Sequence, residues 1–338
     1  MTLGVAVVGL GFMGRTHVDA YRAAHAAGFA NRLVAVADRS ADLSGARPGV
    51  KGNLERADTA PLFDAERVFV TRDVDEVFRH PDVDLVSIAT HTASHVELAL
   101  TALAASKHVL LEKPVALFAT DVERLLEAEA AASSWVMPAM CMRFWPGWSW
   151  LKEAVASGEH GAVRSLVLRR LAFPPNWSPG FYRDAAANGG ALMDLHVHDA
   201  DLVRWLFGEP ERVRSTGTLD HLTTFYEFPD GPPHVVAEAG WDHAPGYAFR
   251  MAYTAIFERA TVEFELGHDP TWTLSADGER RVLSLPPETG YDLEVRHALD
   301  CAARGVRPAP TLAEAAGLAH MLDAERRSLA TPGAQRGR

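Results

Sequence analysis

The sequence has little lysine, little cysteine and no long apolar run. Only four of its 338 residues are lysine, so arginine carries nearly all of the positive charge. Two cysteines, Cys141 and Cys301, cannot form a disulfide scaffold or a four-thiolate metal site. No apolar run approaches the roughly 20 residues needed to cross a bilayer, and the first residues lack the basic flank of a signal peptide. We therefore expect a soluble, cytoplasmic protein.

Negative charge exceeds positive charge. The 44 acidic and 33 basic residues give a formal net charge of -11 at pH 7. Nucleic-acid phosphates and anionic membrane surfaces repel such a protein, so neither class of partner is expected. The hydrophobic fraction of 48% and the charged fraction of 23% are typical of a globular protein. The length favours two domains over a single core.

The first half of the chain has the pattern of a parallel α/β domain. Apolar runs alternate with amphipathic stretches, as they do where crossover helices join buried strands. The expected strands are residues 4–9, 33–38, 83–89, 108–111 and 135–138, and the expected helices are residues 95–105 and 120–132. Residues 40–71 have little pattern and are interpreted as an insertion or a long loop. We assign residues 1–139 to this first domain, a doubly wound parallel sheet.

After Pro146 the pattern becomes rich in strands. The expected strands are residues 163–173, 223–228, 235–241, 247–257 and 260–266, with turn signals at residues 229–231 and 276–278. Helices are expected at residues 151–157, 191–207, 293–304 and 312–329, before a frayed tail at residues 330–338. Long connections without crossover helices favour a large, open, mostly antiparallel sheet. Residues 140–338 therefore form a second α/β domain.

A glycine-rich turn follows the first expected strand. It reads Gly9-Leu10-Gly11-Phe12-Met13-Gly14 and precedes a segment that can form a helix. In a dinucleotide-binding fingerprint the first glycine permits a tight turn, the second lets the backbone approach the pyrophosphate, and the third allows close packing of helix and strand. The amides at the start of the helix then bind phosphate. A flexible loop is the alternative interpretation of a bare glycine triplet.

A carboxylate at the end of the second expected strand supports dinucleotide binding. Asp38 follows Gly14 at about the spacing at which an acidic side chain binds the adenosine ribose hydroxyls. Its charge repels a 2′-phosphate, which favours NAD over NADP. Arg39 and Ser40 follow directly and offer donors to that phosphate, so NADP stays open as the cofactor. A solvated loop residue is the other interpretation of Arg39.

One of the few lysines ends the fourth expected strand. The segment His108-Val109-Leu110-Leu111-Glu112-Lys113-Pro114 is an apolar strand that finishes in a charged pair and a proline. In an open α/β sheet the carboxyl ends of the strands face the cofactor crevice, which puts Lys113 beside the nicotinamide. A partly desolvated lysine can hydrogen-bond a substrate hydroxyl or shift its pKa toward neutrality. An ordinary ion pair at a strand end is the alternative.

The expected helix at residues 191–207 carries a second polar cluster. Asp194, His198 and Asp201 are spaced i, i+4 and i+7, away from the stripe of leucines. A carboxylate one turn from an imidazole can orient it and raise its basicity, as a general base requires. His196 and His198 point about 200° apart on a helix and cannot chelate one ion together, so no metal is expected. Surface charges are the alternative interpretation of the cluster.

Five segments of the chain together resemble the glucose–fructose oxidoreductase, inositol dehydrogenase and MocA (Gfo/Idh/MocA) family. They are the glycine turn at residues 9–14, residues 86–95, Glu112-Lys113-Pro114, residues 194–198 and residues 313–319. The resemblance covers nearly the whole chain. It implies an N-terminal Rossmann domain that binds NAD or NADP, followed by an α/β domain with a large open sheet.

The resemblance also implies roles for single residues. Lys113 would contact the nicotinamide ribose and the substrate, His198 would take the hydroxyl proton during oxidation, and Asp194 would be the partner of His198. The residues expected to bind the cofactor are Gly9, Gly11, Phe12, Met13, Gly14, Asp38, Arg39, Thr90, His91, His95, Glu112 and Lys113. Arg143 matches an arginine at the domain junction, where packing is its expected role.

The chain departs from the family at two positions that bear on the identity of the substrate. The family usually has proline at the position of His91 and glycine at the position of His196. These changes leave the chemistry intact but alter groups near the substrate. The expected substrate contacts are Trp177, Tyr182, Arg183 and His196, although core packing is an equal explanation for the tryptophan.

The family resemblance implies a reversible hydride transfer between NAD(P) and a secondary alcohol of a sugar or polyol. Two alternatives exist among relatives: a glycosidase that oxidises its substrate transiently with bound NAD, and a catalytically silent, sugar-responsive regulator. The intact set of Lys113, Asp194 and His198 argues against the regulator, because a binding protein need not keep an acid–base pair.

Self-association is expected through the second sheet. Residues 163–170 and 247–257 carry apolar side chains on both alternating sets, more than one layer of helices can cover. Relatives commonly form dimers or tetramers through this sheet. We therefore expect a homodimer or homotetramer.

Overall fold

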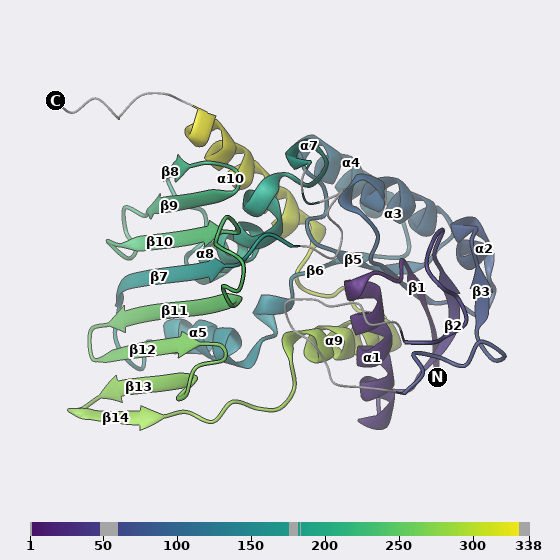
Figure 1. Ribbon diagram of the computed structural model, residues 1–338, viewed down its shortest axis with the longest axis horizontal. Coiled ribbons are helices and arrows are strands. Elements are labelled where there is room, and N and C mark those ends of the chain that lie inside the picture. Colours follow the sequence, from purple (N-terminus) through teal and green to yellow (C-terminus); the bar gives the residue numbers. More distant parts are fainter. Residues whose placement is uncertain (1, 48–59, 176–181, 183, 331–338) are drawn as a thin grey trace. The chain divides into compact units, whose positions relative to one another are not determined.

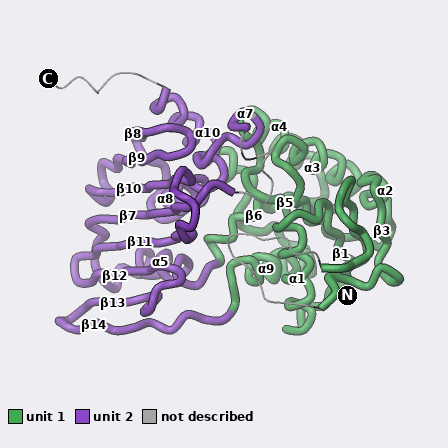
Figure 2. Tube along the Cα trace, viewed as in Figure 1, with its two compact units in different colours: residues 1–144, 288–317 green, residues 145–287, 318–338 purple. Residues whose placement is uncertain are grey.

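The computed structural model describes residues 2–47, 60–175, 182 and 184–330 (Figure 1). It divides the chain into two compact units, residues 1–144 with 288–317, and residues 145–287 with 318–338 (Figure 2). The predicted division into residues 1–139 and 140–338 differs from these units in two respects: the first boundary lies between residues 144 and 145, and residues 288–317 belong to the first unit. Residues 288–317 return to the first unit, because the helix that they contain supplies part of the core of that unit.

The described part of unit 1 contains a sheet of six parallel strands in the order β3-β2-β1-β4-β5-β6. The strands are β1 (Leu3–Val8), β2 (Asn31–Ala37), β3 (Phe69–Thr71), β4 (Leu85–Ile88), β5 (His108–Glu112) and β6 (Val136–Ala139). The order reverses between β1 and β4. Ligands of such sheets bind at the carboxyl ends of the strands on either side of this switch point.

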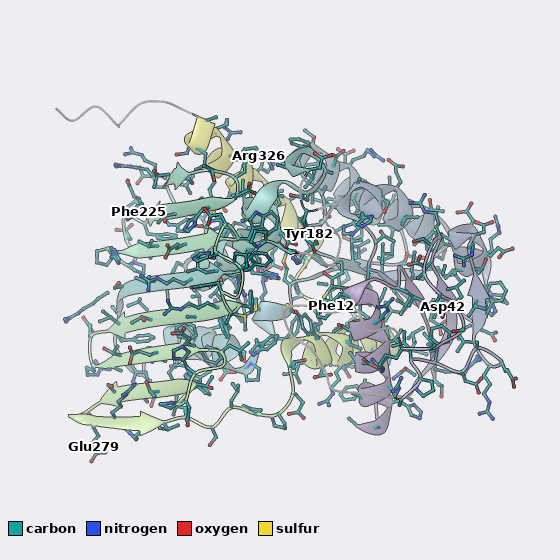
Figure 3. The ribbon with its side chains drawn as sticks, viewed as in Figure 1. Phe12, Asp42, Tyr182, Phe225, Glu279 and Arg326 are labelled. Carbon is teal, nitrogen blue, oxygen red and sulfur yellow. The ribbon has the colours of Figure 1, made fainter. Side chains whose placement is uncertain are left out.

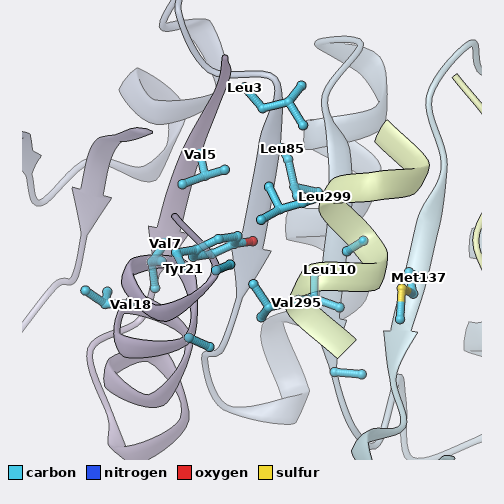
Figure 4. Packing of buried hydrophobic residues seen from close by; sticks show 14 of the residues in the cluster. Leu3, Val5, Val7, Val18, Tyr21, Leu85, Leu110, Met137, Val295 and Leu299 are labelled. Carbon is cyan, nitrogen blue, oxygen red and sulfur yellow. The ribbon is translucent and has the colours of Figure 1, made fainter. Parts of the chain in front are cut away.

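The helices of unit 1 are α1 (Phe12–Ala26), α2 (Val74–Arg79), α3 (His95–Ala104), α4 (Ala119–Ala131) and α9 (Gly290–Arg304). α1 and α9 lie side by side against the sheet, where Val295 and Leu299 of α9 join Val5, Tyr21 and Leu85 in one buried cluster (Figure 4). Burial of one such aliphatic side chain stabilises the fold by about 1.5–3 kcal/mol. A capping box of Thr289 and Asp292 begins α9. The core of unit 1 is therefore incomplete without α9.

The segment at residues 40–71 is only partly the loop that was predicted. Residues 69–71 form β3 at the edge of the sheet, which is a correction of that prediction. Leu62 and Phe63 are buried in the core, so this part of the segment is anchored by apolar packing. Residues 48–59 lie outside the described residues.

Unit 2 is built on a sheet of eight strands, counted over its described residues, in the order β14-β13-β12-β11-β7-β10-β9-β8. The strands are β7 (Val163–Leu171), β8 (Arg212–Gly217), β9 (His221–Glu227), β10 (Val235–Gly240), β11 (Arg250–Phe257), β12 (Ala260–Glu265), β13 (Trp272–Ala276) and β14 (Glu279–Val282). Only the pairing of β7 with β10 is parallel among these strands. The predicted fold class, a parallel Rossmann-like sheet with a second, mostly antiparallel sheet, is confirmed.

Helices cover one face of the second sheet. They are α5 (Pro146–Ser157), a π-helical turn (Leu192–His196), α8 (Val197–Phe207) and most of α10 (Leu312–Ala330). The short helix α7 (Ala185–Asn188) precedes the π-helical turn. Trp148 of α5 packs on Tyr253 and Phe264 of the sheet, and fully buried Leu166 and Leu168 complete this side. On the opposite face, Phe225 of β9 is 45% exposed; Figure 3 labels this residue. We call this opposite side the open face of unit 2.

None of the helices in the described part of the chain combines the length and the apolar composition needed to span a bilayer.

Candidate active site

The glycine turn joins β1 to α1 and gives each of its three glycines a different environment. Gly9 has a φ of 91°, which a residue with a side chain rarely adopts. A Cβ atom on Gly14 would lie 1.7 Å from the carbonyl oxygen of Gly9, so the close approach of α1 to β1 requires glycine. A Cβ atom on Gly11 would meet no described atom within 4 Å. The protein itself therefore does not require glycine at position 11, whereas a bound pyrophosphate would.

Asp38 ties the loop after β2 to the glycine turn. Its Oδ2 accepts a hydrogen bond of 2.7 Å from the backbone N–H of Leu10, and its Oδ1 accepts from Ser40 at 2.8 Å and from Ala41 at 2.7 Å. Burial alone would raise the pKa of Asp38, but these hydrogen bonds outweigh burial and lower the pKa. The carboxylate is therefore charged at neutral pH. It is half-buried beside the helix start, where ribose hydroxyls can reach its remaining lone pairs.

Arg15 is a candidate cofactor residue that the sequence reasoning missed. It lies in the first turn of α1, and its charge is close enough to Asp38 for the carboxylate to raise its pKa, against the larger lowering by burial. The Nη1 atom of Arg15 is buried and has no hydrogen-bond partner among the described residues. A buried guanidinium donor without an acceptor fits a negatively charged ligand. The signal in the sequence was a basic residue directly after the third glycine.

The remaining predicted residues around the glycine turn take three kinds of position. Phe12 and Met13, the first residues of α1, are half-buried (Phe12 is labelled in Figure 3). Arg39 and His91 are exposed. Thr90 is half-buried at the carboxyl end of β4, and its Oγ1 lies 2.7 Å from the Oγ of Ser94.

His95 is buried and joins two loops at the carboxyl ends of the strands. Its Nδ1 lies 2.9 Å from the carbonyl oxygen of Pro114, and its Nε2 lies 3.0 Å from the carbonyl oxygen of Thr90. Burial is the main cause that lowers the pKa of His95, and a neutral imidazole donates from only one nitrogen. His95 therefore lies between the segments after β4 and β5, and its neutral ring donates to one of the two carbonyl oxygens.

Glu112 is the last residue of β5, and Lys113 follows it. Glu112 is buried, and its Oε1 lies 2.9 Å from the Nε2 of His17 in α1. Its Oε2 accepts a hydrogen bond of 3.1 Å from the backbone N–H of Lys113. Lys113 is half-buried at the carboxyl end of β5, on the same side of the sheet as the glycine turn and Asp38. The structure thus brings the predicted residues of unit 1 to the carboxyl ends of its strands.

The predicted acid–base residues of unit 2 lie at a change of helix type. Asp194 is in the π-helical turn, and His198 is the second residue of α8. Both side chains are half-buried, in contrast to the fully buried residues around them. A π-helical turn widens the helix locally and is frequent at functional sites. The prediction of one regular helix over residues 191–207 is corrected here.

His196 does not lie where a substrate can reach it, which corrects its prediction as a substrate contact. Its side chain is fully buried, and its Nε2 lies 2.7 Å from the Oε2 of Glu325 and 3.0 Å from the hydroxyl of Tyr226. Tyr226 donates to the Oε1 of Glu325 at 3.0 Å, and Thr224 donates to its Oε2 at 3.1 Å. Burial and the charge of Glu325 raise the pKa of Tyr226. His196 therefore joins α10 to the second sheet.

Of the other predicted substrate contacts, one is described. Tyr182 packs edge-on against Trp241 with ring centroids 5.7 Å apart, and Figure 3 labels it near the end of the second sheet. Trp177 and Arg183 lie outside the described residues. Arg143 is buried and forms an ion pair with Glu314, which fits the packing role expected of it.

A possible metal-binding group that was not predicted lies in unit 2. His221, Asp242 and His243 bring one potential ligand atom each within 4.8 Å of one another. The Nδ1 of His221 lies 2.6 Å from the Oδ1 of Asp242, and this contact raises the pKa of His221 despite its partial burial. An ion pair between His221 and Asp242 therefore explains why these side chains lie together.

The residues of unit 1 fit a dinucleotide. The open space at Gly11, the charged carboxylate of Asp38 and the buried Nη1 of Arg15 surround the start of α1. A helix of this length presents backbone donors and a positive dipole at its first turn. These groups would hold a pyrophosphate and an adenosine ribose.

Comparisons with known proteins agree with this interpretation of the fold. Residues 3–140 match the model of an oxidoreductase family with an NAD-binding Rossmann fold, GFO_IDH_MocA. Residues 148–263 match the model of the GFO/IDH/MocA C-terminal domain. Together these two models cover most of both units.

The similar proteins include dehydrogenases of cyclic alcohols. The chain is 34% identical over 149 residues to a myo-inositol 2-dehydrogenase from Thermotoga maritima, covering 44% of this chain and 43% of that protein. It is 25% identical over 279 residues to trans-1,2-dihydrobenzene-1,2-diol dehydrogenase from Bos taurus, covering 75% and 80%. The chain matches about half of the length of other relatives, 44% and 53% for uncharacterized oxidoreductases from Rhizobium meliloti and Synechocystis.

The fold is also that of a solved enzyme structure. Levoglucosan dehydrogenase in complex with NADH matches with a TM-score of 0.80 at 21% identity, over 98% of this chain and 97% of that one. At this level of identity the likeness concerns the fold.

Proposed function

Because the chain belongs to the Gfo/Idh/MocA family of oxidoreductases with an NAD-binding Rossmann domain, we propose that it transfers a hydride between NAD(H) and a secondary alcohol of a sugar or polyol. The observation that carries this proposal is that three predicted features lie together at the carboxyl ends of the strands of the first sheet. The glycine turn, Asp38 and Lys113 all lie there, at the carboxyl ends of β1, β2 and β5. A half-buried ammonium group beside a dinucleotide site is suited to bind a reacting hydroxyl.

Each proposed catalytic residue has one task. The ammonium group of Lys113 binds and polarises the oxygen of the reacting alcohol. The imidazole of His198 accepts the hydroxyl proton during oxidation and returns it during reduction, and Asp194 orients that imidazole. The nicotinamide, when bound, accepts or donates the hydride. Asp38 and Arg15 bind the adenosine half of the cofactor.

The proposed substrate class is a cyclic alcohol with several hydroxyl groups. Support comes from the names of the similar proteins, which act on myo-inositol and on a dihydrobenzene diol, and from the levoglucosan dehydrogenase whose fold the chain shares. Half-buried Tyr182, which packs edge-on against the buried Trp241, supplies an aromatic ring, and sugar rings pack well on such rings. The particular substrate requires an experiment.

The test is incubation of the protein with NAD and a panel of inositols, anhydrosugars, aldoses and glycosides. We expect net formation of NADH with at least one cyclic polyol, and loss of this activity in Lys113→Ala and His198→Ala. Release of free sugar from a glycoside without net NADH would replace the proposal with an NAD-dependent glycosidase. Binding of a sugar without turnover under all conditions would replace it with a sugar-responsive regulator.

A further inference from the structure

A fully buried carboxyl group in unit 1 has no hydrogen-bond partner. Glu294 lies in α9, its side chain is 0% exposed, and neither of its carboxyl oxygens has a partner among the described residues. Buried polar atoms in native proteins are nearly always paired, because an unpaired one costs the free energy of its lost hydration. A glutamate at this position therefore needs an explanation beyond packing.

The neighbours of Glu294 are His17 of α1 and Glu112 of β5. One side-chain atom from each of the three residues lies within 4.8 Å of the other two. Glu112 receives two donors, the Nε2 of His17 at 2.9 Å and the backbone N–H of Lys113 at 3.1 Å. Glu294 receives none among the described residues. The described donors in this cluster therefore point to Glu112, and none of them points to Glu294.

Two carboxylates buried within 4.8 Å of each other repel, which favours the protonated form of one of them. Burial, and second to it the charge of Glu112, raise the pKa of Glu294 well above its usual range. The other titratable groups near the pair are His95 and Lys113 beside Glu112, and Tyr21, whose hydroxyl lies 2.8 Å from Ser87. Glu294 is thus a neutral acid with a hydroxyl group that can donate toward Glu112, directly after a small rotation or through one water.

We propose that Glu294 and Glu112 share one proton and that Glu294 is a positioning residue for Lys113. Glu294 acts through Glu112. The shared proton holds the Glu112 carboxylate at a single charge and in one orientation, in which its Oε2 binds the backbone N–H of Lys113. That hydrogen bond fixes the start of the segment from which the Lys113 ammonium group projects.

The proposal rests on the proposed function, because it assumes that Lys113 contacts the reacting oxygen. It also has a consequence that is independent of catalysis. Above the ordinary pKa of glutamate, about 4.3, the unfolded chain has lost this proton while the native protein retains it. Stability therefore falls with rising pH until native Glu294 ionises. Glu294→Gln removes this part of the pH dependence.

The experiment compares Glu294→Gln, which keeps the shape and a donor, with Glu294→Leu, which keeps the volume but has no donor. In the wild type we expect kcat to fall at alkaline pH, when the pair loses its shared proton. Glu294→Gln should keep kcat at neutral pH within about threefold of wild type and should lack this alkaline fall. We expect Glu294→Leu to lower kcat by about 10- to 100-fold, the effect of displacing a reacting group by less than about 1 Å. The free energy of unfolding of Glu294→Leu, measured with urea, should not fall together with kcat, because an apolar replacement of buried ionised groups is often neutral or stabilising.

Glu325→Gln is the matched control. Glu325 is equally buried, but it lies in unit 2 with His196 and Tyr226 as partners. This variant should lower stability without changing the alkaline limb of the kcat profile. An unchanged kcat in Glu294→Leu, or an alkaline limb that persists in Glu294→Gln, would overturn the positioning role.

Failure of the proposed function gives a different result. If the wild-type protein oxidises no alcohol, the pH dependence of unfolding alone decides about the proton. Equal pH dependence in wild type and Glu294→Gln would then overturn the shared proton, whereas a flatter curve in Glu294→Gln would support it.

Discussion

At residue scale, Asp38 has a structural role and a proposed binding role. Its carboxylate accepts hydrogen bonds from the glycine turn and from its own loop, so it organises the nucleotide site before any ligand arrives. In the proposed binding mode, the same charge would face the position where NADP carries its extra phosphate. The two roles predict different results for different substitutions.

We predict that wild-type protein binds NAD more tightly than NADP by more than about tenfold, because like charges brought together cost several kcal/mol. Asp38→Asn keeps an acceptor for Leu10 but removes the charge, and should narrow or reverse this preference. Asp38→Ala should weaken both cofactors, because the turn loses its anchor. Fluorescence titration with each cofactor measures these affinities. NADP binding to wild type at least as tightly as NAD would refute the assignment and point to Arg15 and Arg39.

His198 and Lys113 should differ in how their loss affects the reaction. His198→Ala should lower kcat by roughly 10²–10⁴-fold and leave NAD affinity nearly unchanged, because only the proton transfer is lost. Lys113→Ala should weaken turnover and productive substrate binding together. Lys113→Arg keeps the charge in a larger group that cannot give up its proton, and should restore cofactor binding but little activity. Steady-state kinetics and NAD titration separate these effects.

Two results would change those roles. Turnover near the wild-type level in Lys113→Arg would mean that Lys113 contributes charge alone. Turnover near the wild-type level in His198→Ala would move proton transfer to another group, with Lys113 as the first candidate.

The sequence predicts the site residues whose role depends on their spacing from an apolar strand. The glycine turn, Asp38 and the Glu112-Lys113 pair lie at the carboxyl ends of the strands, as predicted. Arg15 and Glu294 were missed because burial and neighbours give them their significance. No spacing indicates that a glutamate of α9 lies beside His17.

At the scale of elements, the glycine turn allows a matched test of structure against binding. Gly14→Ala places a Cβ atom 1.7 Å from the Gly9 carbonyl oxygen and should lower the free energy of unfolding by about 3 kcal/mol, the upper end for an overpacked core. Gly11→Ala adds a methyl group to open space at a φ of -64°, so stability should stay unchanged. The same methyl group should weaken NAD binding by about 10- to 100-fold. Urea unfolding and NAD titration measure the two effects, and equal stability loss in both variants would contradict the prediction.

Strands were predictable where both faces are buried. β1, β2, β4, β5 and β6 lie at the predicted positions because their apolar runs are continuous. β8, β13 and β14 were not predicted. β8 and β14 are exposed and rich in arginine, and β13 is a short strand of mixed polarity. The hairpin between β13 and β14 was visible only as its turn, where Asp277 and Gly278 both have positive φ.

At the scale of the whole molecule, the open face of unit 2 carries apolar groups that none of the described helices of that unit covers. Phe225 and Ile256 are 45% and 39% exposed there. Ion pairs within the same face, such as Arg169 with Glu238, balance its charge. A face with both signs of charge around apolar groups is complementary to a second copy of itself.

We predict that the protein self-associates through this face. Phe225→Asp should shift the mass in solution toward the monomer, because it places a charge in the apolar part of the interface. Phe118→Asp is the control: it removes an equally exposed aromatic in unit 1, at a helix start that tolerates aspartate. Sedimentation or light scattering at micromolar concentration measures the mass. A monomeric wild type would refute the prediction.

The return of α9 to unit 1 affects the order in which the protein is made. The ribosome releases β1, α1 and the glycine turn first, but their apolar surface is covered only when residues 290–304 have emerged. The whole of residues 145–287 is synthesised in between. Tyr21, His17 and Glu112 therefore lack their contacts with α9 while residues 145–287 are synthesised, and chaperones and proteases can reach them during that time. We expect the core around the nucleotide site to be complete only on chains that have been translated through α9.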